Sequence, residues 1–242
     1  MRLAKRKALI SHRRRVRRKT KRLALLILLT SLGAVIGWFV LTLPYFCITK
    51  IEVEGQEKLS KDTILKQAAI PKQRSIFRVD LREVSRRIAQ VSRVKKAEVR
   101  RVFPSTLLVL VQERVPFAYL EKRAHLWEVD EEGVVIGKAA KKQDLPLITG
   151  SGVSRDQTEK IELGVKILTS FQELGLPLER LNIANENSIV GDLEKGPQVY
   201  LTEDGYFDYV AYLPLVLADA KRKGTRIKYV DLRFREQIVV GY

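Results

Sequence analysis

The stretch Leu23–Leu43, LALLILLTSLGAVIGWFVLTL, contains 21 residues and no charged side chain. As an α-helix rising about 1.5 Å per residue, it would be roughly 30 Å long, which matches the hydrocarbon thickness of a bilayer. Its apolar core is longer than the roughly 7–15 residues of a cleaved signal peptide, and no small-residue cleavage motif follows it. We therefore predict a retained membrane-spanning helix over 23–43.

The segment before this helix, residues 1–22, is strongly basic and holds no acid. Its cations are Arg2, Lys5, Arg6, Lys7, Arg13, Arg14, Arg15, Arg17, Arg18, Lys19, Lys21 and Arg22. Because Lys and Arg beside a spanning helix stay in the cytosol, the tail is predicted to be cytoplasmic and the rest of the chain extracytoplasmic. Trp38, Phe39, Tyr45 and Phe46 fit an aromatic belt at the outer interface.

The net charge of +17 comes mostly from this tail, because the remaining 33 Lys and Arg face all 28 acids. The part after the helix therefore carries only +5, and its composition does not indicate a nucleic-acid-binding domain. The tail alone has the charge to contact anionic lipid or nucleic acid.

Residues 48–116 are predicted to form one small domain of β-α-α-β-β order. Alternating polarity, capping residues and apolar spacing predict a strand at 48–54, helices after Ser60 and at 81–91, and strands at 94–102 and 106–113. Pro71 should end the first helix, and Phe103-Pro104-Ser105 should form the turn between the last two strands. The strand at 106–113 is apolar on both faces, which favours a central position in the sheet.

Residues 117–242 are predicted to form a second domain, a mixed or antiparallel β-domain with two helices. The pattern predicts a hairpin at 126–135, a helix at 157–174, short antiparallel strands near Ile183, at 188–190 and at 198–201, and a helical segment at 206–223. Pro214 should kink or divide that last segment. The predicted fold class is thus α+β, with a single N-terminal transmembrane helix.

We find no motif typical of an enzyme, a metal site or a cofactor site. The only cysteine is Cys47, and the two histidines, His12 and His125, are far apart in the sequence. The acids between Glu128 and Glu132 lack the register of a calcium loop, so we interpret them as a solvated hairpin tip. We predict a non-enzymatic protein without a cofactor or a small-molecule substrate.

The C-terminal segment offers a different kind of site, the open edge of a sheet. A terminal strand at 237–242 would present unpaired peptide groups to an extended segment of another protein. The candidate partner-binding residues are Arg233, Phe234, Glu236, Gln237, Ile238, Val239, Val240, Gly241 and Tyr242. Phe234 and Tyr242 would be aromatic anchors, and Arg233 could pair with an acid of the partner. From the residues alone, it is equally plausible that this strand simply completes the core.

Several phrases of the sequence resemble one family of bacterial proteins. They are SIFRVDL at 75–81, VKKAEV at 94–99, FPSTL at 103–107, the ER-x-P-x-A pattern at 113–118, a W-x-x-D-x-x-G hairpin from Trp127 and YVDLRF at 229–234. Together they resemble the FtsQ/DivIB cell division proteins, covering essentially the whole chain. The domain at 48–116 is then similar to a POTRA domain, and 117–242 is similar to the family's C-terminal β-domain.

This resemblance implies a bitopic scaffold of the division machinery, located at the septum in the cell (inner) membrane. Its POTRA domain would contact other division proteins, and its C-terminal edge strand would bind the small bitopic proteins FtsB and FtsL. The complex would link early and late division proteins and regulate septal peptidoglycan synthesis by other enzymes. The alternative from the residues is a POTRA-bearing envelope assembly or translocation factor that binds extended polypeptides, although such proteins usually carry several POTRA units.

Overall fold

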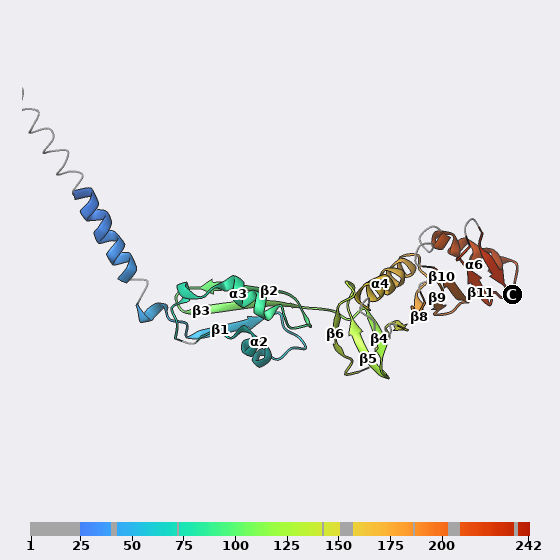
Figure 1. The fold of residues 1–242 in the computed structure, drawn as a ribbon, viewed down its shortest axis with the longest axis horizontal. Coiled ribbons are helices and arrows are strands. Elements are labelled where there is room, and N and C mark those ends of the chain that lie inside the picture. Colours follow the sequence, from blue (N-terminus) through green and yellow to red (C-terminus); the bar gives the residue numbers. More distant parts are fainter. Residues whose placement is uncertain are drawn as a thin grey trace, which may run out of the picture. The chain divides into compact units, whose positions relative to one another are not determined.

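The computed structural model describes residues 25–39, 43–71, 73–141, 143–150, 157–185, 187–202, 209–234 and 237–242. The chain divides into two compact units (Figure 1). The first comprises Met1–Gln56, Ser60–Ile88 and Ala97–Val111, and the second comprises Glu57–Leu59, Ala89–Lys96 and Gln112–Tyr242.

The first helix of the described chain runs over residues 25–39, and its large apolar side chains are exposed. No helix in the described ranges is both long enough and apolar enough to cross a bilayer. The predicted span at 23–43 also includes residues 23, 24 and 40–42, which lie outside the described residues, as does the basic tail.

The N-terminal sheet has three strands, and its order confirms the position predicted from polarity. The elements in chain order are η1 (Pro44–Phe46), β1 (Lys50–Glu54), α2 (Lys61–Ala68), η2 (Ile76–Arg78), α3 (Leu81–Ile88), β2 (Val94–Val102) and β3 (Thr106–Glu113). The order β1-β3-β2 places the doubly apolar β3 in the centre, with β1 parallel to it. The helices α2 and α3 contact each other (Figure 1).

Local sequence signals explain where these elements begin and end. The hydroxyl of Ser60 accepts a hydrogen bond from the Thr63 amide at 3.2 Å, so it caps α2 as predicted. The helix ends at Ala68, because Ala69 takes a left-handed conformation, two residues before Pro71. Leu107, Val109 and Val111 are buried on one face of β3 and contribute to the core of this sheet.

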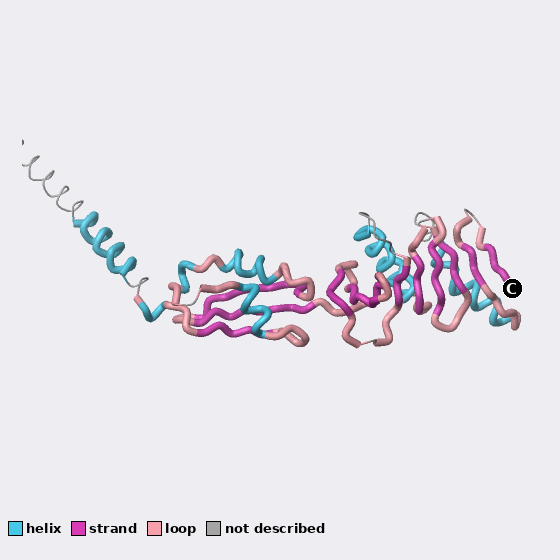
Figure 2. Tube along the Cα trace, turned by 60° about the horizontal axis from the view of Figure 1, so that its bottom comes forward, coloured by secondary structure: helices cyan, strands magenta, loops and turns pink. Residues whose placement is uncertain are grey.

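The second sheet has nine strands in the order β12-β11-β10-β9-β8-β7-β4-β5-β6 (Figure 2). Its strands are β4 (Ala118–Lys122), β5 (His125–Val129), β6 (Val135–Lys138), β7 (Leu147–Thr149), β8 (Leu178–Asn182), β9 (Ile189–Leu193), β10 (Gln198–Leu201), β11 (Tyr229–Asp231) and β12 (Val239–Gly241). The helices α4 (Gln157–Glu173) and α6 (Leu213–Arg222) share one apolar core with these strands. The α+β fold class is therefore confirmed.

The short strands expected near Ile183, at 188–190 and at 198–201 are neighbours and pair antiparallel as predicted, within a sheet that is mixed overall. The pairs β8–β9 and β9–β10 are antiparallel, but β4–β7, β7–β8 and β10–β11 are parallel. Two parallel strands that follow one another along the chain require a crossover connection, and the two helices provide one each. α4 connects β7 to β8, and α6 connects β10 to β11. The strand β8 also ends just before Ile183 rather than around it.

The two predicted helices of this domain are present, with one division that the sequence explains. The apolar positions Ile161, Val165, Leu168 and Phe171 of α4 are all buried, as their spacing predicts. Residues 210–212 form the 3-10 turn η3, and α6 begins at Leu213 with Pro214 in its first turn. Proline is tolerated there because that position has no helical N–H bond to lose. Residues 206–208 of the predicted segment lie outside the described residues.

The interpretation of 128–132 as a solvated hairpin tip is wrong for two of its acids. Glu128 and Asp130 are buried, at 5% and 2% exposure. Arg93 pairs with Glu128 and Arg114 pairs with Asp130, all within the second compact unit. Buried carboxylates need such partners, since an unpaired buried charge is very costly. Only Glu131 and Glu132 are largely exposed, and both bind Lys95.

The carboxylate of Glu113 holds a loop of the same unit. It accepts hydrogen bonds from the backbone amides of Glu57, Lys58 and Leu59 at 2.8–3.1 Å. Burial raises the pKa of Glu113, but the amide donors outweigh it, so the net pKa lies below its ordinary value. The ER-x-P-x-A phrase therefore has a structural role, because Glu113 orders this loop and Arg114 pairs with a buried acid.

Replacing Glu113 by Gln should loosen this loop, because charge-assisted hydrogen bonds from three amides become neutral ones. We expect local opening to become easier by about 1–3 kcal/mol, which corresponds to roughly 5- to 150-fold faster amide exchange at 57–59. Hydrogen exchange with mass spectrometry measures this, with the exposed Glu121→Gln as the matched control.

The effect of E113Q should also depend on pH. A lowered folded-state pKa stabilises the protein above the ordinary carboxyl pKa of about 4.3, and this stabilisation is lost as the pH falls through the folded pKa. Exchange at 57–59 in wild type and E113Q should therefore converge in acid. Equal exchange in the two proteins at neutral pH would contradict the assigned role.

Candidate interaction edge

The candidate partner-binding segment lies at the end of the nine-stranded sheet. β12 pairs antiparallel with β11, joining Val240 to Val230 and Val239 to Asp231. It is the last strand in the sheet order, so one of its two edges has no neighbour among the described strands. An edge of this kind presents main-chain N–H and C=O groups that an extended segment can pair with.

The side chains of the segment divide between the core and the surface. Ile238 packs against the core of the sheet. Exposed side chains are Phe234, Gln237, Val239 and Tyr242, while Arg233, Val240 and Gly241 are half-buried. Glu236 lies outside the described residues. The terminal segment therefore contributes to the core and also leaves apolar and aromatic groups exposed.

Arg233 is already paired within the chain. Its guanidinium donates to the carboxylate of Asp231 at 2.9 and 2.6 Å, and to the hydroxyl of Ser188 at 3.2 Å. The hydrogen bond from Arg233 lowers the pKa of the Asp231 carboxyl, although burial opposes it. The guanidinium also lies 5.2 Å from the centre of the Tyr200 ring, within cation–π range. This network fixes the end of β11 and therefore the start of the C-terminal segment.

Sequence reasoning missed the residues that hold Arg233. Asp231 and Arg233 stand two positions apart at the end of a strand, which places both side chains on one face. That spacing is a signal that was available in the sequence. Ser188 and Tyr200 come from other strands, so only the folded sheet brings them to this guanidinium.

Gly241 is required by the packing of Tyr229. A Cβ atom at position 241 would overlap the Tyr229 ring, which lies across the glycine. The same ring meets Tyr200 edge to face, with centroids 5.8 Å apart. A glycine in β12 therefore allows an aromatic ring to cover the strand, and the sheet face beside the edge consists of two tyrosines and Arg233.

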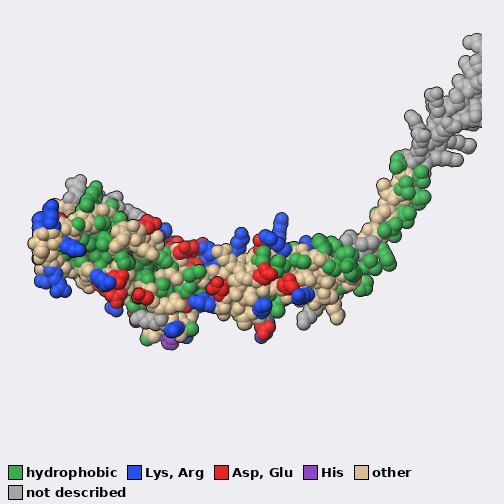
Figure 3. Space-filling model, turned by 180° about the vertical axis from the view of Figure 1, so that it is seen from behind, with side chains coloured by type: hydrophobic (Ala, Val, Ile, Leu, Met, Phe, Trp, Pro, Cys, Tyr) green, Lys and Arg blue, Asp and Glu red, His purple; other side chains and the backbone are tan. Residues whose placement is uncertain are grey.

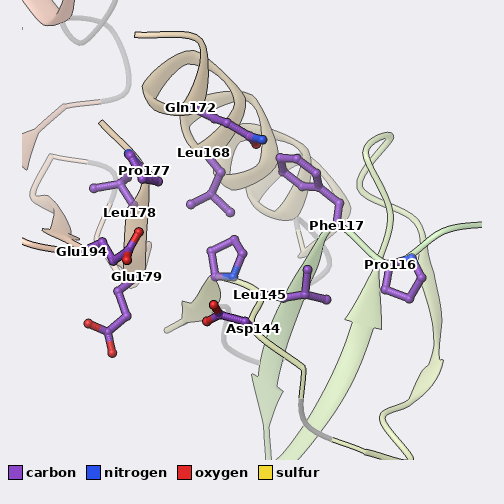
Figure 4. Close-up of a pocket in the computed structure, with 11 residues that line it drawn as sticks. Pro116, Phe117, Asp144, Leu145, Leu168, Gln172, Pro177, Leu178, Glu179 and Glu194 are labelled. Atoms are coloured by element: carbon purple, nitrogen blue, oxygen red, sulfur yellow. The ribbon is translucent and has the colours of Figure 1, made fainter. Parts of the chain in front are cut away.

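A second surface feature lies elsewhere in the same unit, a depression of about 440 Å³ beside α4. Figure 4 shows Leu168 pointing into it from α4, with the Phe117 ring at one side. The carboxylates of Asp144, Glu179 and Glu194 lie at its margin. It holds apolar contacts and acids, but no cation or nucleophile converges on it, and no group of metal-binding side chains exists in the described part of the chain.

Comparison with known proteins assigns the chain to a family. Residues 46–114 match the model "POTRA domain, FtsQ-type", and residues 118–233 match "Cell division protein FtsQ/DivIB, C-terminal". Cell division protein FtsQ of Syntrophotalea carbinolica is 31% identical over 235 residues, covering 88% of this chain and 82% of that protein. The chain belongs to the FtsQ/DivIB family of cell division proteins.

Other family members match over shorter regions. FtsQ of Streptomyces bingchenggensis is 34% identical over 51% of this chain, and DivIB of Clostridium tetani is 25% identical over 46% of it. These matches span about half the length of the two relatives, at 48% and 42%. The resemblance inferred from the sequence phrases is thereby confirmed at the level of the family and of a role in division.

A solved structure also matches part of the chain. It is the major extracytoplasmic domain of the trans isomer of the division protein DivIB from Geobacillus stearothermophilus. The match covers 46% of this chain and 97% of that one, with 18% identity and a TM-score of 0.30. These values are too low to support an argument, so the assignment rests on the sequence comparisons.

The Arg233 network gives a prediction about the edge. Asp231→Asn should loosen the β11–β12 pair, because a neutral amide cannot replace the bidentate pairing of a buried carboxylate with Arg233. We expect a loss of about 1–3 kcal/mol in local stability, measured as faster amide exchange at Val239 and Gly241, which lie opposite Asp231 and Tyr229 of β11. The matched control is Asp219→Asn, which breaks exposed pairs with Arg222 and Lys223 and should leave these amides unchanged. Unchanged exchange in D231N would show that the Asp231–Arg233 pair does not stabilise β12 at the edge.

Proposed function

We propose that this protein is a non-enzymatic scaffold of the division machinery that captures an extended segment of a partner along β12. In keeping with the family resemblance, the partners are bitopic division proteins of the FtsB/FtsL kind, and the POTRA domain contacts further division proteins. Through these contacts the protein links early and late division proteins and regulates septal peptidoglycan synthesis by other enzymes.

The observation that carries this proposal is the contrast between the two ends of the nine-stranded sheet. Natural proteins block sheet edges with charged side chains, especially lysine. The edge strand β6 ends in Lys138, whose ammonium lies 5.7 Å from the centre of the Trp127 ring. The opposite edge strand, β12, consists of Val239, Val240 and Gly241 and carries no charge. An uncharged edge between the exposed Phe234 and Tyr242 suits pairing with another strand.

The partner need not supply an acid for Arg233. Because that guanidinium is engaged by Asp231 and Ser188, an incoming carboxylate would have to share it or displace one of these partners. Main-chain pairing, with side-chain contacts to Val239, Phe234 and Tyr242, is therefore the better basis for affinity. Aromatic side chains such as these are the residues that most often dominate binding energy at interfaces.

Substitutions on the edge test this proposal. Val239→Glu places a charge on the open edge, and Phe234→Ala removes an aromatic anchor; each should weaken binding of FtsB- or FtsL-type extracytoplasmic segments by at least about 10-fold, or 1.4 kcal/mol. Binding of labelled segments to the full chain in detergent measures the affinity. Leu215→Glu, at a more exposed apolar position on α6, is the control and should bind like wild type. Equal binding by all variants would show that β12 only completes the core.

The proposed location is the cell membrane at the septum, with residues 23–43 as a single spanning helix. The basic tail at 1–22 is then cytoplasmic, and the domains at 48–116 and 117–242 are extracytoplasmic. The tail's twelve cations and the absence of charge from 23–43 support this orientation. Anchoring would confine the search for bitopic partners to the plane of the membrane.

Single cysteines test this orientation. In a Cys47→Ser background, Lys195→Cys provides a strongly exposed thiol in the second unit, and Ser11→Cys provides one in the tail. A membrane-impermeant maleimide added to spheroplasts should label position 195 at once and position 11 only after lysis. Labelling of position 11 in intact spheroplasts would overturn the orientation.

A further inference from the structure

We propose that four aromatic rings on the first compact unit, Tyr45, Phe46, Phe77 and Phe103, form a surface that rests in the headgroup region of the bilayer. We refer to these four residues as the aromatic ladder. The inference rests on the proposed membrane anchoring and extends it from the spanning segment to the folded domain.

The aromatic ladder is one continuous surface made from three separate segments. Tyr45 and Phe46 come from η1, Phe77 from η2, and Phe103 from the turn between β2 and β3. Ring centroids are 5.4 Å apart for Tyr45–Phe46, 5.3 Å for Phe46–Phe77 and 5.5 Å for Phe77–Phe103. Only the fold brings Phe77 and Phe103 to the two residues that follow the apolar segment.

Tyr45, Phe77 and Phe103 face outward rather than into the core, and Phe46 is half-buried between Tyr45 and Phe77. Tyr45 is 67% exposed, Phe103 58% and Phe77 38%, and the neighbouring Val102 is 43% exposed. Figure 3 shows hydrophobic side chains gathered at the end of the first unit that carries η1. Single exposed apolar residues need no explanation, but a contiguous group of this kind marks an interaction site.

The exposure of Phe77 is imposed by its surroundings. Its neighbour Ile76 is completely buried, which fixes the turn η2 to the core. The Arg101 guanidinium donates to the carbonyl oxygens of Ile76 and Val79, both at 2.8 Å. The Ile48 amide donates to the Arg74 carbonyl at 2.9 Å, and Cys47 pairs with Ser75, which joins η2 to the segment after η1. The ring at 77 is therefore held outward by a fixed backbone.

Chain length indicates what covers the ladder. The helix described at 25–39 ends six residues before Tyr45, so the chain can extend at most about 22 Å between them. With 23–43 spanning the bilayer, Tyr45 follows the end of the span by two residues and falls within the interfacial region. Tyr rings are enriched in this region because they are amphipathic, and Phe is among the side chains that bury at the boundary between headgroups and acyl chains.

Charge beside the ladder also fits lipid. Arg74 and Arg78 flank Phe77 in sequence, and both are exposed. Cations near a membrane surface are attracted to anionic headgroups. A surface of stacked rings bordered by exposed arginines combines the two interactions that hold a domain at an anionic bilayer.

Fluorescence quenching of single-tryptophan variants tests the inference. The full chain is reconstituted into vesicles of phosphatidylcholine and phosphatidylglycerol, with or without bromine on the acyl chains close to the headgroup. The native tryptophans provide both references, because Trp38 lies in the apolar segment and Trp127 lies in β5. Four proteins keep one tryptophan each: Trp38, Trp127, Phe77→Trp or Phe103→Trp, with Phe at the other native tryptophan positions.

Brominated lipid should quench Trp38 and both ladder tryptophans by at least a third and leave Trp127 unchanged. If Trp38 is quenched and both ladder positions behave like Trp127, the chain is anchored but the ladder is not in lipid, and the inference fails. If quenching at the ladder is abolished by adding FtsB- or FtsL-type segments, a protein is the occupant, and the inference also fails. If Trp38 itself is not quenched, the anchoring on which the inference rests fails with it. Matching circular dichroism spectra ensure that the variants are folded.

Discussion

Pairing of main-chain hydrogen bonds is the constraint on which the second unit of this protein depends. A peptide group in a sheet needs a partner on each side of its strand, or else water. Seven of the nine strands meet this need with neighbours on both sides, and only β6 and β12 stand at the ends of the order. The two ends are treated differently, because β6 ends in a lysine and β12 has no charge. The candidate interaction site lies at β12 because the hydrogen-bonded pairing of the sheet ends at that strand.

Arginine–carboxylate pairs complete this framework where polar groups enter the interior. Arg93, Arg114 and Arg233 each meet a buried acid, at Glu128, Asp130 and Asp231. Such pairs are weak evidence for stability, because the cost of removing both charges from water offsets their attraction. They are directional, however, and the planar guanidinium fixes the geometry of its partner. At Asp231–Arg233 this geometry determines where the chain leaves β11 and turns toward β12.

The aromatic ladder and the open edge lie in different compact units and serve different proposed contacts. One is apolar, aromatic and bordered by cations, which suits lipid. The other combines unpaired peptide groups with aliphatic and aromatic side chains, which suits a polypeptide strand. The depression beside α4 has acids at its margin, and none of the residues that line it indicates a particular ligand. With these two proposed contacts on separate units, one chain would rest on the membrane surface through the aromatic ladder and bind a partner strand along β12.

The sequence by itself determined much of this protein. Periodicity and capping located α2, α3, β2, β3 and α4 to within a few residues, because each is long enough to repeat its pattern or carries a strong cap. It also gave the central position of β3, the division at Pro214, the family and the C-terminal candidate segment. The sequence patterns did not predict strands β4 and β7.

Only the tertiary structure decided how distant segments meet. It made several strand pairs parallel, because α4 and α6 act as crossovers, and a helical pattern alone does not say which strands it joins. It also buried Glu128 and Asp130. From the sequence alone, acids in a turn are expected to be solvated, and only the fold brings Arg93 and Arg114 to them. It also placed Ser188 and Tyr200 at Arg233, and it placed Phe77 beside both Phe46 and Phe103. The physical reason is the same in each case: local sequence sets which backbone conformations are favourable, whereas long-range pairing depends on packing that no short window of residues contains.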